Sequence, residues 1–413
     1  MSRHILAAFP SASESSLAKI YSTSCNLDYL PENILIDVLS YLSVRELVRA
    51  GRVCKRWRRL VKDQKLWRLV DLTAWKGMTS RILWVLLRQY LGCGLRYLRL
   101  RGLLLSVRGG TFLSEAWLKA LSTKCPRLSK LYLLHADLRS LPSCQLLPPS
   151  LKVLELQGCE LPHGFFNQGI AASPQENTAP SGISIECLIL NSVPSFKDQH
   201  LQSLTSWERL SRLELCDTFH VTANGLRGCA AKEGVCGLEG LFRLKFLEMS
   251  ITTRQGYQRP MASLGLETGW LGLEELSLGG KEVAPGFPYA SRLKDLKRLY
   301  LKACTLDELQ VLHNCKMLRG LPGFLRLEFL DVVFQPRRCS PEGAAGGEGE
   351  QDQEGEEEAA DADHGDNGNN DNKPDKLIQN LRRLLAVMLP CCTLAFNNCS
   401  VQHNSNLGSN LFI

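Results

Sequence analysis

The chain has 413 residues, of which 44% are hydrophobic, enough for a sizeable core and two to four domains. Its sixteen cysteines are scattered and well below the density of a disulfide scaffold, so we expect reduced thiols in the cytoplasm or the nucleus. The longest apolar runs, "ILWVLL" and "LLAVMLPCCTLAF", are too short or too interrupted to cross a bilayer, so we expect no membrane partner.

The first elements of the chain are a tail and a small helical unit. Residues 1–27 have no secretory or transit pattern and are predicted to be a disordered tail. Residues 28–72 predict three short helices, the second opened by a capping box of Ser43 and Glu46. Three helices in roughly forty residues bury too little area to be stable alone, so this unit should have a partner surface.

The same region is strongly basic. Residues 45–68 contain ten Lys or Arg and two acidic residues, a balance of +8. Such a surface could contact the phosphates of a nucleic acid. Trp57 and Trp67, however, lie in phase with the apolar stripe and do not form a platform for base stacking. We therefore interpret the charge as the solvated side of a docking unit and expect no nucleic-acid partner.

A repeat fills most of the remaining chain, after a predicted linker helix within 73–94. The pattern L-x-x-L-x-L occurs nine times, starting at residues 95, 128, 151, 185, 210, 244, 273, 296 and 327. Segments with helical periodicity separate many of the copies. Each unit is predicted to be a strand followed by a helix, and residues 95–336 to be a leucine-rich-repeat array. The predicted fold is an α/β solenoid with a curved parallel sheet inside and helices outside.

Three stretches interrupt the period. Residues 162–184 and 227–240 are predicted to be loops inserted between repeats of the array. Residues 337–375 are predicted to be an acidic disordered insertion, because 342–375 carry thirteen acidic residues and one Lys, a balance of −12 within a chain of net charge +7. Residues 376–413 are predicted to form a last repeat that caps the array, with a helix in "KLIQNLRRLLAVMLP" and an edge strand in "CTLAF".

Residues that alternate with the inward leucines should face the concave side of the sheet, where a partner protein would bind. Both ends of this face combine Tyr with Arg or Lys, which suits anchoring of a protein substrate. The predicted substrate-contact residues are Tyr97, Arg99, Arg101, Lys130, Tyr132, Arg298, Tyr300 and Lys302. The rest of the face is predicted to include Glu155, Arg212, Glu214, Phe246, Glu248, Glu275, Phe329 and Asp331.

Patterns for metal binding and catalysis are weak. Cys391, Cys392, Cys399 and His403 are close in sequence, but two adjacent cysteines lack the spacing that lets both thiolates reach one zinc ion. There is no Gly-rich phosphate loop, no G-x-S-x-G and no H-E-x-x-H. We predict no metal, no cofactor and no catalytic residue.

The order of motifs resembles a known family. The segments "LPENILIDVLSYLS", "RVCKRWRRL" and "LW" are similar to the F-box, and leucine-rich repeats follow them. Gly51, the acidic stretch and the loop at 162 depart from the usual pattern. The resemblance implies docking onto the Skp-type adaptor of a cullin-RING ubiquitin ligase. The implied adaptor-binding residues are Leu30, Pro31, Ile34, Leu35, Leu39, Leu42, Leu47, Val53, Cys54, Trp57, Leu60 and Trp67.

The resemblance further implies a function without intrinsic catalysis. The chain would be the substrate-recognition subunit of an SCF-type ligase, linked through the adaptor to the cullin and RING subunits. Its repeats would hold target proteins for ubiquitination and proteasomal degradation, with catalysis by proximity. An alternative is a leucine-rich-repeat scaffold or stoichiometric inhibitor that does not promote degradation.

Overall fold

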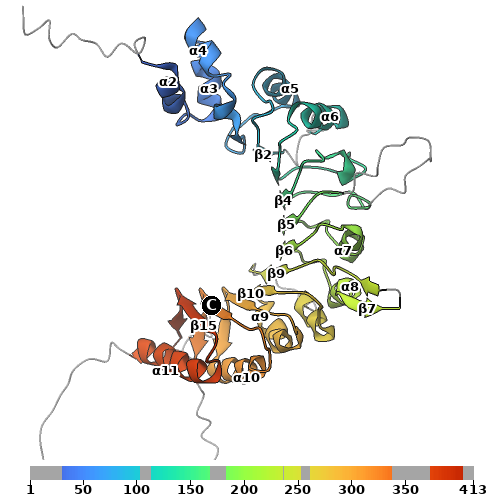
Figure 1. Cartoon of the computed structure of the whole chain (residues 1–413), viewed down its shortest axis with the longest axis vertical. Helices are drawn as coiled ribbons and strands as arrows, with labels where there is room; N and C mark the ends of the chain where they lie inside the picture. The colour runs from blue at the N-terminus through green and yellow to red at the C-terminus, as the bar shows by residue number, and fades with distance from the viewer. Residues whose placement is uncertain are drawn as a thin grey trace, which may run out of the picture.

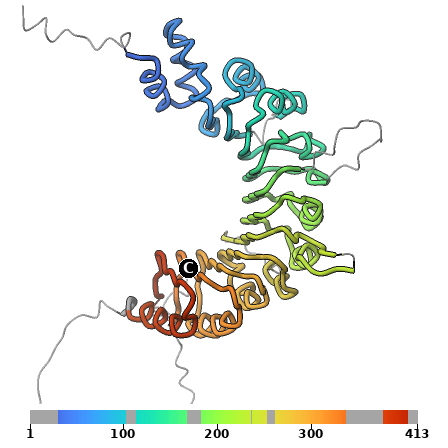
Figure 2. The backbone as a smooth tube through the Cα atoms, viewed as in Figure 1, coloured from blue at the N-terminus to red at the C-terminus, as the bar shows by residue number. Residues whose placement is uncertain are grey.

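The computed structural model describes residues 30–102, 113–167, 183–235, 237–252, 261–336 and 373–402. These residues form an arch (Figure 1). Helices of the N-terminal segment lie at one end, parallel strands stack along the inner side, and helices and turns lie along the outer side. The tube in Figure 2 shows the same curvature, with each repeat adding one layer to the arch. This arrangement confirms the predicted solenoid.

Residues 30–67 form a unit that we call the N-terminal helical module. Its elements are α2 (Glu32–Leu39), α3 (Val44–Ala50), α4 (Lys55–Leu60) and the 3-10 helix η2 (Gln64–Trp67). The predicted capping box is present, because the Ser43 amide donates to Glu46 Oε2 at 2.8 Å. Cys54 caps α4, its Sγ accepting from the Trp57 amide at 3.4 Å. Local side-chain to backbone bonds therefore determine where these short helices begin.

The inner side of the arch is one sheet of eleven strands in the described residues, in the order β1-β2-β3-β4-β5-β6-β9-β10-β11-β13-β15, all parallel. The strands are β1 (Leu69–Asp71), β2 (Tyr97–Arg101), β3 (Lys130–Leu134), β4 (Val153–Gln157), β5 (Cys187–Asn191), β6 (Arg212–Cys216), β9 (Phe246–Ile251), β10 (Glu275–Gly280), β11 (Arg298–Lys302), β13 (Arg326–Leu330) and β15 (Thr393–Asn397). A second parallel sheet of β12 (Thr305–Asp307), β14 (Val333–Gln335) and β16 (Ser400–Val401) lies near the C-terminal end.

The outer side is made of helices. The α-helices are α5 (Ser80–Gln89), α6 (Glu115–Lys124), α7 (Asp198–Ser203), α8 (Ala223–Cys229), α9 (Val283–Gly286), α10 (Glu308–Leu318) and α11 (Lys373–Met388). The 3-10 helices are η3 (Cys144–Leu146), η4 (Leu204–Ser206), η5 (Ala262–Thr268) and η6 (Phe287–Arg292). Thr79, Ser114 and Thr222 each accept from a backbone amide at a helix start, as N-caps do.

The predicted interruptions have different outcomes. Within 227–240, α8 continues to Cys229, and an antiparallel hairpin of β7 (Lys232–Gly234) and β8 (Gly237–Glu239) follows. Residues 168–182 of the loop and 337–372 of the acidic insertion lie outside the described residues, as do residues 1–29. The predicted helix and edge strand of the last repeat are present as α11 and β15, and α11 begins at Lys373, before the predicted boundary at 376.

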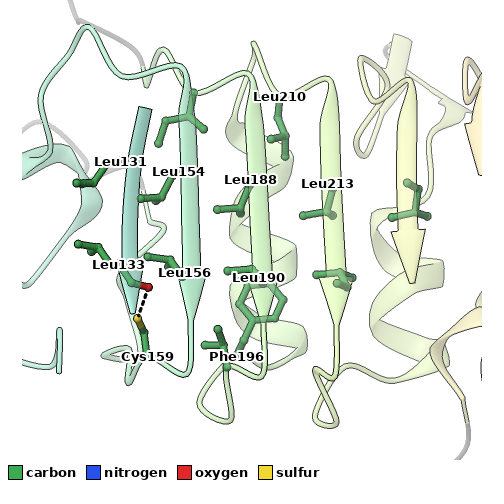
Figure 3. Packing of buried hydrophobic residues seen from close by; sticks show 14 of the residues in the cluster. Leu131, Leu133, Leu154, Leu156, Cys159, Leu188, Leu190, Phe196, Leu210 and Leu213 are labelled. Carbon is green, nitrogen blue, oxygen red and sulfur yellow. Dashed lines mark hydrogen bonds between the residues drawn. The ribbon is translucent and has the colours of Figure 1, made fainter. Parts of the chain in front are cut away.

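The core is a ladder of aliphatic side chains running through the stack (Figure 3). Leu131, Leu154, Leu188 and Leu213 align in register on adjacent strands, and each is at most 1% exposed. A buried cysteine that follows β4 is bonded to the preceding layer, because Cys159 Sγ donates to the Leu133 carbonyl at 3.3 Å. Since each layer buries its leucines against the next, no repeat has a complete core by itself.

Each strand is followed by a sharp turn that leads into the outer side. The first residue after the strand has a positive φ in most repeats, as at His135, Ser192, Asp217, Ala303, Asp331 and Asn398. Gly158 and Gly280 take the same conformation. The left-handed residue turns the chain out of the sheet, so the turns stack as regularly as the strands do.

The register of the last predicted copy is wrong. The pattern predicts a hexamer that starts at 327, but Leu299 pairs with Leu327 and Leu301 with Phe329, so this repeat starts at Phe324. Phe329 was predicted on the concave face but is fully buried, and Asp331 lies in the turn. Apolar residues at 324, 327, 329, 330 and 332 fit two phases, and only the pairing with β11 selects one.

One further repeat begins earlier than the first hexamer. In "WRLVDL", residues 67–72, Val70 pairs with Leu98, and β1 is thereby the first strand of the sheet. Trp67 takes the place of the entering leucine. It is fully buried, donates from Nε1 to the Val61 carbonyl at 2.6 Å and stacks on Tyr90 with ring centroids 4.7 Å apart. The helical module therefore continues directly into the sheet.

Candidate functional site

The N-terminal helical module exposes apolar side chains along one helix. Ile34, Val38 and Tyr41 follow at i, i+4 and i+7 and are 42%, 53% and 90% exposed. This spacing places them on one side of α2 and the turn after it, on a different side from the buried Leu35 and Leu39. We call Ile34, Val38 and Tyr41 the α2 stripe. Val53, which is 68% exposed, adds a further apolar side chain after α3.

The twelve residues predicted to bind an adaptor divide into three groups. Those buried inside the chain are Leu35, Leu39, Leu47, Leu60 and Trp67. Those partly buried are Leu30, Leu42 and Trp57, and those exposed are Pro31, Ile34, Val53 and Cys54. Buried residues can only support a docking surface from beneath. Val38 and Tyr41 were absent from the predicted set, although the i, i+4, i+7 spacing with Ile34 was readable in the sequence.

Basic side chains of the module also have structural contacts. Arg59 forms an ion pair with Glu32, which links α4 to the start of α2. Arg56 Nη2 donates to the Leu30 carbonyl at 2.6 Å, and Arg58 Nε donates to the Gly51 carbonyl at 3.4 Å. Part of the positive charge therefore holds the three helices together.

The concave face of the sheet is the second candidate surface. Three rows of side chains alternate with the buried leucines, and the middle row runs through Arg99, Tyr132, Glu155, Ile189 and Glu214 on consecutive strands. Arg212 Nε lies 2.6 Å from Glu214 Oε1, and the Arg212 guanidinium lies 3.6 Å from the centroid of the Phe246 ring. Burial raises the pKa of Glu155, and the negative charge of Glu214 adds to the effect.

The structure places all eight predicted substrate-contact residues on strands β2, β3 and β11. They form two groups at opposite ends of the sheet, because five strands separate β3 from β11. Tyr132 is almost fully buried beneath its neighbours, at 4% exposed. The sequence placed these residues on the right face but did not reveal how each charge is compensated.

Several thiols of the array are buried or partly buried. Burial raises the pKa of Cys159, Cys187 and Cys216 to about 11 and of Cys144 and Cys304 to about 12. A thiol with such a pKa is protonated near neutral pH and is a poor nucleophile. Within the described residues, no group of three or more His, Cys, Asp or Glu side chains is arranged to hold a metal ion, and His403 lies outside them. In the same residues, no helix has the length and apolar content to span a bilayer.

Comparison with known proteins agrees with both parts of this architecture. A family model described as F-box-like matches residues 27–73. A human protein named F-box/LRR-repeat protein 12 is 35% identical over 304 residues, which cover 68% of this chain and 86% of that protein. The chain belongs to the F-box/LRR-repeat family. The predicted resemblance is thereby confirmed.

Other relatives carry the same name. The mouse F-box/LRR-repeat protein 12 is 41% identical over 198 residues, covering 48% of this chain and 58% of its own length. The bovine protein is 34% identical over 304 residues, covering 68% and 86%. In this F-box/LRR-repeat chain, the matched F-box segment contains the whole helical module and ends just beyond β1. The F-box and the first strand of the repeats thus overlap in sequence.

Proposed function

We propose that this chain is the substrate receptor of an SCF-type ubiquitin ligase and acts in the cytoplasm or nucleus. The F-box binds the Skp-type adaptor, the adaptor connects to the cullin and RING subunits, and the repeats hold protein targets for ubiquitination and proteasomal degradation. The observation that carries the proposal is the α2 stripe. An exposed apolar row on a small helical module that belongs to an F-box family is suited to docking on a partner.

The proposed adaptor surface is narrower than the twelve predicted residues. Ile34, Val38 and Tyr41 supply its centre, and Pro31 and Val53 are further exposed candidates. Leu35, Leu39 and Leu47 support these side chains from the core. Helix-in-groove binding uses anchors at i, i+4 and i+7, which is the spacing of the stripe.

The junction to the repeats supports a role as a receptor. Trp67 belongs to both the module and the first repeat, and the Gly94 amide donates to Gln64 Oε1 at 3.2 Å. A Cβ at Gly94 would lie 2.7 Å from the Gln64 carbonyl oxygen, so the two parts are in close contact. A rigid junction presents a bound target at a constant position relative to the adaptor. Presentation of this kind raises the effective concentration of a target lysine without any chemistry from the chain itself.

The direct test is co-purification of the Skp-type adaptor with the full chain and with Val38→Asp. We expect Val38→Asp to reduce capture at least tenfold, because a carboxylate would be buried unpaired in an apolar interface. Val387→Asp is the matched control. Val387 is 80% exposed on α11, so the same substitution there should leave adaptor capture unchanged.

Thermal unfolding of both variants separates docking from folding, since neither side chain is buried. Equal capture of the adaptor by wild type and Val38→Asp would refute the proposed surface. The alternative of a non-degradative scaffold is tested separately by following bound targets in cells. Depletion of this chain should raise their levels and lower their ubiquitination, and unchanged levels would favour the scaffold.

A further inference from the structure

Charge is compensated unevenly along the concave face. At the C-terminal end, the predicted substrate-contact cations of β11 are paired with glutamates of the two preceding strands: Arg298 with Glu275 of β10 at 2.5 Å, and Lys302 with Glu248 of β9 at 3.0 Å. Arg326 similarly lies 2.7 Å from Glu328. These positive charges are largely neutralised within the sheet. They are therefore less available to a partner, because a ligand would first have to break an existing pair.

The N-terminal end differs. Arg101 and Lys130 are exposed, and among the described residues no acidic side chain forms an ion pair or hydrogen bond with either of them. Between them, Arg99 lies 4.5 Å from the centroid of the Tyr132 ring and pairs with Asp71 at 2.9 Å. We call Tyr97, Arg99, Arg101, Lys130 and Tyr132 the N-terminal concave patch.

The centre of this patch is held in one geometry. The Tyr132 hydroxyl donates to Gln157 Oε1, which anchors the ring beneath Arg99. The Arg99 Nε is buried and has no hydrogen-bond partner in the described structure. A stacked and ion-paired guanidinium loses little side-chain entropy when a partner binds. The patch thus combines an ordered centre with two cations at its sides that no acidic side chain of the described residues neutralises.

The dimensions of the patch suit an extended chain. Lys130 pairs with Tyr97 across β2 and β3, and Arg101 lies four residues beyond Tyr97 on β2. At about 3.3 Å per residue, the two cations are separated by about 13 Å along the strand direction. A segment of four or five residues in an extended conformation covers this length.

We propose that the N-terminal concave patch binds an extended segment of a partner protein that is rich in Asp and Glu. This inference rests on the proposed receptor function and names the chemical class of its target. Carboxylates about four residues apart would pair with Arg101 and Lys130, while Arg99 and Tyr97 contact the backbone and side chains between them. Tyr132, which is 4% exposed, supports Arg99 from beneath. The C-terminal group of predicted contacts, centred on Arg298 and Lys302, takes no part in this binding.

The test uses the full chain and a fluorescein-labelled twelve-residue peptide of alternating Glu and Ser, with alternating Gln and Ser as the neutral peptide. Fluorescence anisotropy gives Kd at low and moderate salt. We expect Arg101→Gln combined with Lys130→Gln to weaken binding at least tenfold. The matched control, Arg298→Gln combined with Lys302→Gln, removes the same charge from the same face and should change Kd less than twofold.

The other outcomes overturn the proposal. An equal loss of peptide affinity in both double variants would mean that binding depends only on the net charge of the protein. Tighter, equally patch-dependent binding of a twelve-nucleotide thymidine oligomer would assign the patch to nucleic acid. Peptide binding only after the acidic residues of 342–375 are changed to Asn and Gln would reassign the patch to this chain's own acidic stretch. Adaptor capture is measured on the same proteins, so a failure here is distinguishable from a failure of the receptor function.

Discussion

At the scale of single residues, Trp67 connects the two parts of the chain. It belongs to the F-box segment by motif and to the first repeat by register, because "WRLVDL" supplies β1. The sequence pattern predicts that Trp67 lies on the apolar side of a helix. It does not predict that Trp67 is also the first residue of a repeat, because a tryptophan there replaces the usual leucine. Its indole is buried, hydrogen-bonded to the Val61 carbonyl and stacked on Tyr90.

Replacing this indole tests the junction. We expect Trp67→Ala to lower the free energy of unfolding by about 3–5 kcal/mol, because it leaves a large cavity and an unpaired carbonyl. Trp84→Ala is the control. Trp84 is only partly buried on α5, so this substitution should lower the free energy of unfolding clearly less than Trp67→Ala does. Urea unfolding followed by circular dichroism measures both. A loss at Trp67 no larger than at Trp84 would contradict the role of the junction.

The buried thiols, also single residues, make the stability of the fold depend on pH. Burial raises the pKa of Cys144 and Cys229 to about 12 from an ordinary value near 9.0. Between about pH 9 and 12 the unfolded thiol loses its proton while the folded thiol keeps it. The unfolded state then binds fewer protons, so stability is full below pH 9 and falls as pH rises.

We expect the free energy of unfolding to fall by about 1 kcal/mol per pH unit for each such thiol above pH 9. Urea titrations at pH 8, 9 and 10 measure the slope. Cys144→Ala removes one of these groups and should give a shallower slope than the wild type, whatever its effect on stability at pH 8. An identical slope would show that Cys144 does not contribute.

At the scale of elements, the turn after each strand determines how closely layers pack. His135 and Ser192 adopt the same positive φ as Gly280, so the conformation alone is tolerated by larger residues. Gly280 differs from them because the preceding repeat leaves no room for a side chain. A Cβ there would lie 2.0 Å from the Ile251 carbonyl oxygen of the preceding repeat. The constraint arises from the neighbouring layer and is invisible in the local sequence.

Gly280→Ala should therefore lower the free energy of unfolding by about 2 kcal/mol or more, through a steric clash with backbone in addition to the left-handed conformation. Gly320→Ala is a matched control. A Cβ at Gly320 would meet nothing closer than the Met317 carbonyl at 3.6 Å, so stability should change by less than about 0.5 kcal/mol. Chemical denaturation of both variants provides the comparison, and equal effects would contradict the clash.

At the scale of the whole molecule, stability should vary along the arch. Interior strands have two neighbours and fully buried leucines, as Leu188 on β5 and Leu213 on β6 show. The last strand, β15, pairs only with β13 in the described residues, and its inward Leu394 and Phe396 are only partly buried. In a solenoid, each layer is stabilised mainly by its neighbours, so the end layer opens most easily.

Hydrogen exchange followed by mass spectrometry tests this gradient. We expect the backbone amides of β15 and α11 to exchange at least tenfold faster than those of β5 and β6, because local opening at the end costs less free energy. Peptides from β1 and β2 serve as the comparison, since the helical module covers that end. Uniform protection from β2 to β15 would contradict layer-by-layer stability.

The sequence by itself determined the order of parts, the solenoid and the inward faces of most strands. Those features follow from local periodicity and motif order, which are written in consecutive residues. Tertiary structure alone decided the register at Phe329, the double role of Trp67, the burial of Leu35 and the exposure of Tyr41. It also decided which concave cations are already neutralised. The physical reason is that burial, pairing and strand register depend on neighbours about 20 to 70 residues away, as Lys302 with Glu248 illustrates.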